Sequence, residues 1–150
     1  MIVTARLSFS AAHRLHNPSR DAEWNRRMYD KCDNPAGHGH NYVIHVSVRG
    51  RIDAETGMVI DLKKLKDIVR DRIIDRVDHR NLNQDVDFLR DVIPTAENLA
   101  RCFWQQLAPA IDEGALHEIV LQENEKNSVL YRGEDEQLVT TSRSWPSRAS

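Results

Sequence analysis

The sequence lacks a cysteine framework. Only two cysteines occur among its 150 residues, Cys32 in a polar loop and Cys102 in an apolar helical pattern. Small secreted domains that depend on disulfides are far richer in cysteine. We therefore expect free thiols and a reduced, cytoplasmic setting.

A long apolar segment and an excess of one charge are also missing. No run of about 18 apolar residues occurs, so no membrane-spanning helix is expected. Residues 1–6 have neither the charged region nor the apolar block of a signal peptide. Lys and Arg number 21 against 23 Asp and Glu, a formal charge of −2. This balance argues against nucleic-acid and membrane partners, but it leaves room for a local basic site that binds a polyanionic small molecule.

Alternating apolar and polar residues mark the strands. Residues 3–10 and 38–51 place apolar side chains at every second position, which is typical of half-buried strands. Residues 118–123 and 127–132 are expected to form two closing strands around a turn. Neighbouring strands in sequence tend to pair, so the first two are expected to run antiparallel.

Two helices are expected between these pairs of strands. Residues 61–76 carry apolar side chains at helical spacing after the capping residue Asp61, and Thr95 caps a second helix. The order ββααββ predicts one α+β domain over residues 1–133. The polar segment 16–37 is read as a long loop, a kind that is often functional. Residues 134–150 are polar and aperiodic, and we expect a disordered tail.

Three histidines could converge on a metal ion. His38 and His40 are two positions apart in an expected strand, so both rings point to one face, and His13 can join them if the first two strands pair. Three neutral imidazoles without a thiolate leave a fourth position open, as in catalytic zinc sites. Spacing alone leaves a second interpretation equally open, in which these are surface or hydrogen-bonding histidines.

Cys32, Asp78 and His79 could form an acid–base set. A thiol next to Lys31 and close to a metal dication would favour the thiolate, a stronger base or nucleophile. Asp78 can orient the imidazole of His79 for proton transfer near neutral pH. The alternatives are that Cys32 is a small loop residue or a zinc ligand, and that Asp78 and His79 are ordinary polar loop residues.

Glu123 ends the expected strand 118–123 on the same face as Ile119 and Leu121. A carboxylate on an apolar face is costly to desolvate unless it is paired or binds a ligand, and a ligand with two adjacent N–H donors would satisfy it. If the strand frays at this point, Glu123 is simply solvated.

Considered together, these residues resemble the 6-pyruvoyl-tetrahydropterin synthase family. The resemblance covers about residues 1–133, with its motifs in family order. The segments that carry it are Phe9-Ser10-Ala11-Ala12-His13-Arg14-Leu15, Cys32-x5-His38-Gly39-His40-Asn41-Tyr42, Thr56-Gly57-Met58-Val59, Asp78-His79-Arg80-Asn81-Leu82, Pro94-Thr95-Ala96-Glu97-Asn98, and Glu123 followed by Asn127-Ser128-Val129-Leu130-Tyr131-Arg132-Gly133.

The resemblance implies a role for each candidate residue. Zinc (Zn2+) would be held by three imidazoles, Cys32 would abstract a proton, and Glu123 would anchor the pterin ring with Thr95 beside it. Asp78 and His79 would assist Cys32 across a subunit boundary. The zinc ligands implied by the family are His13, His38 and His40.

The resemblance also implies a fold, an assembly and a substrate. The fold would be the T-fold, a four-stranded antiparallel sheet with two helices on one face, whose sheets close into an oligomeric barrel. Family members are typically homo-oligomers, hexamers built from two trimers. The substrate would be 7,8-dihydroneopterin triphosphate, converted to 6-pyruvoyl-tetrahydropterin with loss of triphosphate.

Three other functions remain open. The 6-carboxy-tetrahydropterin synthases of queuosine biosynthesis use the same substrate but usually show a shorter Cys-x3-His-x-His segment, whereas this chain has Cys-x5-His-Gly-His. A non-catalytic pterin-binding module would not need Cys32, Asp78 and His79. A hydrolase that uses zinc-bound hydroxide would not need the thiol. One departure from the family is Ala96, where a second Thr is common.

Overall fold

The computed structural model describes residues 1–133, and the expected tail 134–150 lies outside the described residues. The elements, in chain order, are β1 (Ile2–His13), α1 (Ala22–Tyr29), η1 (Asp30–Asp33), β2 (His38–Arg49), α2 (Leu62–Val69), η2 (Arg70–Ile74), α3 (Asp75–Val77), β3 (Arg80–Asn81), η3 (Asp87–Leu89), α4 (Ala96–Leu107), η4 (Ala108–Ala110), β4 (Ala115–Gln122) and β5 (Ser128–Tyr131). No helix among the described residues is long and apolar enough to span a bilayer.

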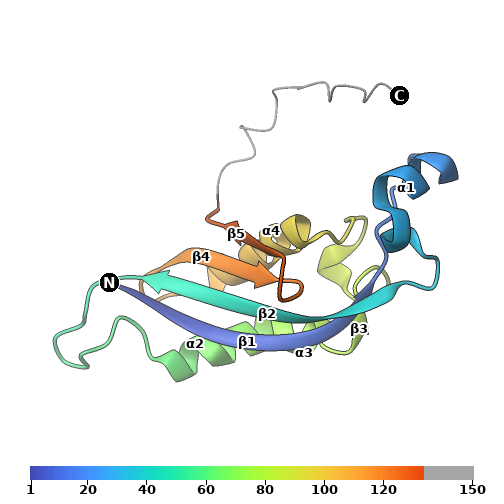
Figure 1. Ribbon diagram of the computed structural model, residues 1–150. Coiled ribbons are helices and arrows are strands. Elements are labelled where there is room, and N and C mark those ends of the chain that lie inside the picture. Colours follow the sequence, from blue (N-terminus) through green and yellow to red (C-terminus); the bar gives the residue numbers. More distant parts are fainter. Residues whose placement is uncertain (134–150) are drawn as a thin grey trace, which may run out of the picture.

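One mixed sheet organises the domain, with strand order β3-β1-β2-β4-β5 (Figure 1). β1, β2, β4 and β5 pair antiparallel, as the alternating pattern predicts. The helix formed by α2, η2 and α3 packs with α4 against one face of the sheet. The expected α+β class and the order of the long elements are therefore confirmed.

The expectation of four strands is wrong by one strand. β3 pairs parallel with the end of β1, where Ala11 and Ala12 lie opposite Arg80 and Asn81. Leu82 continues this link, since its N–H donates to the carbonyl of Ala12 at 2.8 Å. Two residues cannot show a period-two pattern, so this strand has no sequence signature of its own.

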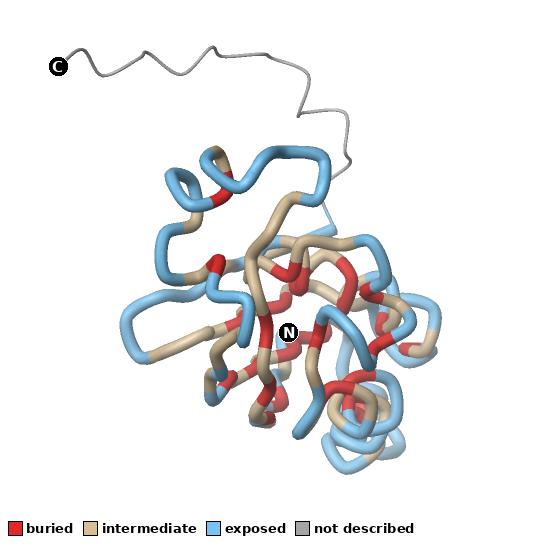
Figure 2. Tube along the Cα trace, turned by 90° about the vertical axis from the view of Figure 1, so that its right-hand side faces the viewer, coloured by how far each residue is buried: buried red, intermediate tan, exposed pale blue. Residues whose placement is uncertain are grey.

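Helix α1 lies in the segment that was expected to be a loop. Asp21 caps it by accepting from the N–H of Trp24 at 2.8 Å, but only Asn25 of its eight residues is buried. The Asn25 side-chain amide donates to three backbone carbonyls, and its oxygen accepts from Asn17 N–H. The helix is thus held by polar contacts, which apolar periodicity cannot reveal. Figure 2 shows it projecting from the body with most of its length exposed.

The helix over 61–76 is confirmed, with Asp61 capping it through the N–H of Lys63, but it contains a π-helical turn at Arg70–Ile74. Side chains four positions apart drift by about 40° around an ordinary α-helix. The wider π turn reverses part of this drift. Four side chains spaced four residues apart therefore all stay in the core: Leu65, Val69, Ile73 and Val77.

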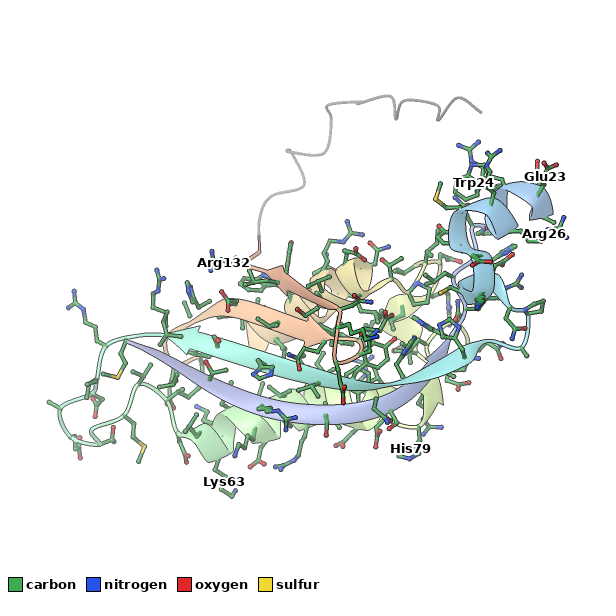
Figure 3. The ribbon with its side chains drawn as sticks, viewed as in Figure 1. Glu23, Trp24, Arg26, Lys63, His79 and Arg132 are labelled. Atoms are coloured by element: carbon green, nitrogen blue, oxygen red, sulfur yellow. The ribbon has the colours of Figure 1, made fainter. Side chains whose placement is uncertain are left out.

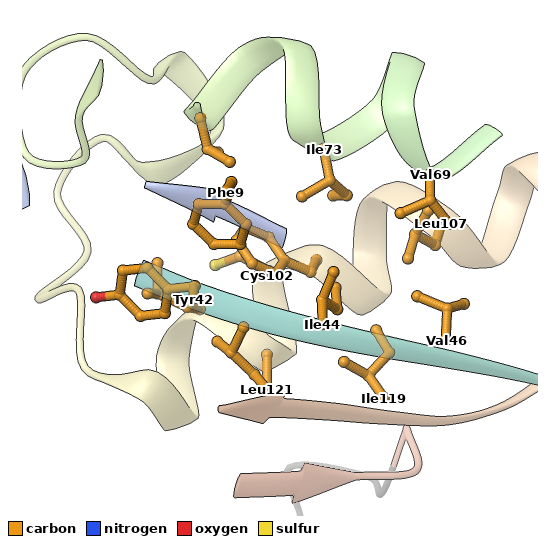
Figure 4. Packing of buried hydrophobic residues seen from close by; sticks show 14 of the residues in the cluster. Phe9, Tyr42, Ile44, Val46, Val69, Ile73, Cys102, Leu107, Ile119 and Leu121 are labelled. Carbon is orange, nitrogen blue, oxygen red and sulfur yellow. The ribbon is translucent and has the colours of Figure 1, made fainter. Parts of the chain in front are cut away.

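The hydrophobic core lies between the sheet and the two long helices (Figure 4). Phe9 stacks on Tyr42 with ring centroids 4.8 Å apart, and Phe103 of α4 meets Phe9 edge to face at 6.0 Å. Tyr42 is the last large side chain of this core before the histidines begin. Its hydroxyl therefore marks the border between the apolar interior and the polar end of the sheet.

We predict that Phe103→Ala lowers the free energy of unfolding by about 3–5 kcal/mol, because it leaves a cavity beneath Phe9. Met58→Ala is the matched control, since Met58 is half exposed, and it should change the value by less than about 0.5 kcal/mol. Urea unfolding followed by circular dichroism measures both. Equal losses for the two variants would contradict the assigned core.

Candidate active site

The end of the β1–β2 ladder brings the three histidines together. His13 pairs with His38 across the two strands, and His40 pairs with Ala11. The Nε2 atoms of His13 and His38 are 3.1 Å apart, and one ring nitrogen from each of the three histidines lies within 4.8 Å of the others. The convergence expected from the spacing is therefore present.

The protein fixes the tautomer of His13. Its Nδ1 lies 2.8 Å from the carbonyl oxygen of Pro94, and since a carbonyl only accepts, Nδ1 carries the proton and donates. The lone pair is then on Nε2, which faces the other histidines. Burial lowers the pKa of His13 to about 4, against the opposing effect of the Pro94 hydrogen bond. His13 is therefore a neutral ligand near neutral pH.

The donor set fits a zinc-like ion. Tetrahedral zinc with Zn–N distances of about 2.0–2.1 Å separates ligand nitrogens by about 3.3 Å, close to the 3.1 Å between His13 and His38. Burial also lowers the pKa of His38, which favours a second neutral imidazole. The Nδ1 of His38 is buried without a hydrogen-bond partner among residues 1–133. Three histidines of the described chain could thus bind a metal ion, with no thiolate in the set.

Glu123 lies beside the histidine cluster. Its Oε1 is 3.7 Å from Nε2 of His13 and 3.8 Å from Nε2 of His40, and its side chain is 21% exposed. A hollow of about 520 Å³ adjoins it, lined by residues that include Arg6, His40, Gln122 and Glu123. The carboxylate is therefore partly desolvated and faces a space that a small molecule could enter.

The electrostatic environment of Cys32 differs from the expectation. Burial, followed by the charges of Glu123 and Asp30, raises the pKa of the thiol. Lys31, which is exposed, does not outweigh these effects. The expectation combined Lys31 with a metal dication, and it stays a prediction for the metal-bound protein; Lys31 alone does not favour the thiolate. The Cys32 carbonyl accepts from Leu15 N–H at 2.9 Å, so the turn that carries Cys32 lies beside the chain just after His13.

Asp78 and His79 form a pair at the edge of the sheet. The Asp78 carboxylate accepts from Ser10 N–H at 2.8 Å and lies 3.0 Å from Nδ1 of His79. The Ser10 hydrogen bond, then His79, holds the pKa of Asp78 below its usual range, so the carboxylate stays ionised. His79 adopts a positive φ of 57°, and its N–H donates to the Ser10 carbonyl at 2.6 Å.

The His79 side chain does not reach the cluster within its own chain. It is 82% exposed, and Figure 3 shows it pointing away from the ribbon below β1. Among the described residues, its hydrogen-bond partner is Asp78, and neither Cys32 nor a cluster histidine contacts it. The structure thus groups Glu123 with the three histidines and leaves the His79 side chain, paired with Asp78, facing outward.

The predicted role of Thr95 as a helix cap is confirmed. Its hydroxyl accepts from the N–H of Asn98 at 3.3 Å at the start of α4. The preceding carbonyl, that of Pro94, accepts the hydrogen bond from Nδ1 of His13. Sequence reasoning missed Pro94 because a backbone acceptor leaves no residue-type signal. It also missed Asp33, although its place next to Cys32 was an available signal.

An α+β fold with a three-histidine cluster that could hold a metal ion, beside a hollow lined by Glu123, defines the class of a small domain with a candidate metal site. A model of the family described as 6-pyruvoyl tetrahydropterin synthase matches residues 2–134. The chain belongs to this family, as its motifs suggested.

Individual relatives agree with this assignment. The 6-pyruvoyl tetrahydrobiopterin synthase of Poecilia reticulata is 47% identical over 132 residues, which cover 88% of this chain and 90% of that protein. The Homo sapiens protein of the same name is 42% identical over 132 residues, covering 88% and 91%. The structure of Caenorhabditis elegans 6-pyruvoyl tetrahydropterin synthase superposes with a TM-score of 0.82 at 41% identity, covering 89% of this chain and 97% of that one.

We predict that His13→Ala removes stoichiometric zinc, because it deletes the buried ligand whose tautomer the protein fixes. His117→Ala is the control, since His117 contacts Arg49 near the far end of the sheet. Metal content per chain is measured by mass spectrometry after dialysis against zinc. Full zinc content in folded His13→Ala protein would rule out the histidine site.

Proposed function

We propose that this protein is a zinc-dependent 6-pyruvoyl-tetrahydropterin synthase that converts 7,8-dihydroneopterin triphosphate to 6-pyruvoyl-tetrahydropterin with elimination of triphosphate. The observation that carries the proposal is the grouping of the histidine cluster with Glu123, 3.7 Å from His13, in a chain whose relatives bear that enzyme's name. The reaction is a carbon–oxygen lyase reaction. We place the enzyme in the cytoplasm, in keeping with its free cysteines.

The three histidines are the proposed zinc ligands. When bound, zinc would supply a Lewis acid that stabilises negative charge on side-chain oxygens of the substrate and acidifies the neighbouring C–H bonds. The neutral state of His13 and the orientation fixed by Pro94 both support this use of the site.

Cys32 is the proposed proton-abstracting residue. Burial, followed by the charges of Glu123 and Asp30, raises the pKa of its thiol. The thiolate is therefore expected to form only when positive charge is present at the neighbouring histidine cluster. This arrangement would tie the reactivity of Cys32 to occupation of the metal site.

Glu123 is the proposed anchor for the pterin ring. Its carboxylate can accept two parallel hydrogen bonds from the adjacent N–H groups of the ring. Its position next to the histidines would hold the substrate side chain near the metal and Cys32. Thr95 and the backbone around it are proposed to border the ring, although the Thr95 hydroxyl already caps α4.

Asp78 and His79 are proposed to act in the site of a neighbouring subunit. His79 is exposed and well oriented by Asp78, yet it contacts no residue of its own histidine cluster. An imidazole held in this way can relay protons through the tautomerisations once another chain brings a site to it. We propose a hexamer of two trimers, in which sheets close a barrel and active sites lie at subunit contacts.

The first test is product analysis by mass spectrometry after incubating the zinc-loaded protein with 7,8-dihydroneopterin triphosphate. We expect triphosphate and 6-pyruvoyl-tetrahydropterin. The 6-carboxy product with acetaldehyde would assign the chain to the queuosine branch instead. A preparation that holds zinc but gives no turnover would support a pterin-binding module.

We predict that Cys32→Ala and His79→Ala are each inactive as pure proteins but recover activity when co-assembled. Random mixing would restore both residues at about a quarter of shared sites, because each site draws on two chains. The control is co-assembly of Cys32→Ala with Cys32→Ser, in which neither chain supplies the thiol and no site is restored. Absence of recovery in verified mixed oligomers would show that both residues serve a site within one chain.

A further inference from the structure

A buried carboxylate lies directly next to Cys32. The Asp33 side chain is only 7% exposed, whereas those of Arg14 and His16 are about one-third exposed. One carboxylate oxygen of Asp33 accepts from Arg14 Nε at 3.0 Å and from Arg14 NH2 at 2.7 Å. The same oxygen lies 2.7 Å from Nδ1 of His16. These three side chains are called the Asp33 cluster below.

The hydrogen bonds of the Asp33 cluster keep the Asp33 carboxylate ionised. The hydrogen bond from His16, followed by that from Arg14, holds the pKa of Asp33 below its usual range. A desolvated carboxylate is costly unless partners satisfy it, so these contacts keep Asp33 in its buried position. Removing either partner would leave the carboxylate undersatisfied.

Backbone hydrogen bonds connect this cluster to Cys32. The Cys32 carbonyl accepts from Leu15 N–H at 2.9 Å, and the Asp33 carbonyl accepts from Arg14 Nε at 3.0 Å. Residues 14 and 15 follow the cluster histidine His13 at the end of β1. Two hydrogen bonds to carbonyls of the η1 turn, those of Cys32 and Asp33, therefore hold this turn against the segment that follows β1 and His13.

The strand end is itself held from the other side. Asn83 acts as a strand partner of Arg14: its Oδ1 accepts from Arg14 N–H at 2.8 Å, and its Nδ2 donates to the Arg14 carbonyl at 2.9 Å. Arg14 thus has its backbone fixed by the loop after β3 and its side chain fixed on Asp33. It is the link between the two segments.

We propose that Arg14 and His16, acting through Asp33, are positioning residues that hold Cys32 at the histidine cluster. This inference rests on the proposed function only in giving Cys32 its role in proton abstraction. Arg14 does not touch the reacting atoms in this arrangement. It sets where the thiol lies by holding both the carbonyl and the carboxylate of Asp33, the residue that follows Cys32.

A competing use of Arg14 and His16 is the binding of substrate phosphates. Arg14 and His16 do line a hollow of about 380 Å³, but Asp91 lines it too, and both basic groups already point at Asp33. A cation that is neutralised by a buried carboxylate attracts an added anion poorly. The positioning role therefore accounts for the geometry better.

The test compares Arg14→Lys, Asp33→Ala and Asp33→Asn with wild type. Lysine carries one point charge and cannot bridge the carbonyl and the carboxylate as the guanidinium does. We expect kcat to fall about 10- to 100-fold in Arg14→Lys and Asp33→Ala, because small displacements of a reacting group have effects of this size. KM should change less than about twofold, because Glu123 anchors the ring independently. Asp33→Asn keeps a carbonyl acceptor and should recover part of kcat.

The matched control is Lys64→Ala. Lys64 also bridges two acceptors, Asp112 and Glu113, and it lies on α2 at the end of the molecule opposite α1 (Figure 1). The Lys64→Ala substitution should leave kcat and KM unchanged. Zinc content of every variant is measured alongside.

A second readout does not depend on turnover. The rate of Cys32 alkylation by iodoacetamide, followed by peptide mass spectrometry, should rise severalfold in Asp33→Ala as the η1 turn loosens. Wild-type kcat and wild-type alkylation in folded Asp33→Ala would overturn the proposal, as would a loss of kcat that merely follows a loss of zinc. If wild type shows no turnover, the proposed function fails, and the alkylation rates still decide the positioning role.

Discussion

The twelve residue pairs between β1 and β2 determine both the core and the site. In this register, which runs from Ile2 opposite Arg49 to His13 opposite His38, Phe9 faces the helices and His13 faces the cluster from one strand face. A slip of one residue would turn every side chain to the other face. The same shift would expose Phe9 and separate the histidines, so stability and the candidate metal site depend on one alignment.

That alignment explains how much could be read from the sequence. Alternation in β1 and β2 revealed their buried faces, and the two-residue spacing of His38 and His40 revealed their common direction. Asp61 and Thr95 showed where helices begin, because capping residues have a chemical identity. Helix α1 and strand β3 could not be found in this way: the first is held by the amide of Asn25, and the second has two residues.

The site was predictable where it depends on neighbours in sequence and not where it depends on the fold. Lys31 and a nearby metal dication suggested a favoured thiolate, but burial, followed by the charge of Glu123, raises the thiol pKa in the protein itself. Glu123 follows β4, whose pairing with β2 depends on the fold. Pro94 contributes a carbonyl, which every residue has. The outward direction of His79 depends on its positive φ beside Ser10, which no spacing rule predicts.

The hydrogen bond between His13 and the carbonyl of Pro94 joins the metal site to the start of α4. The position of that carbonyl is fixed because the next residue, Thr95, caps the start of α4. Binding and local folding that share a contact are thermodynamically linked, and the link is reciprocal. The first turn of α4 would therefore be part of what sets the affinity for a metal ion held by His13. Loss of such a metal ion should accordingly destabilise the first turn of α4, a helix that supplies no ligand.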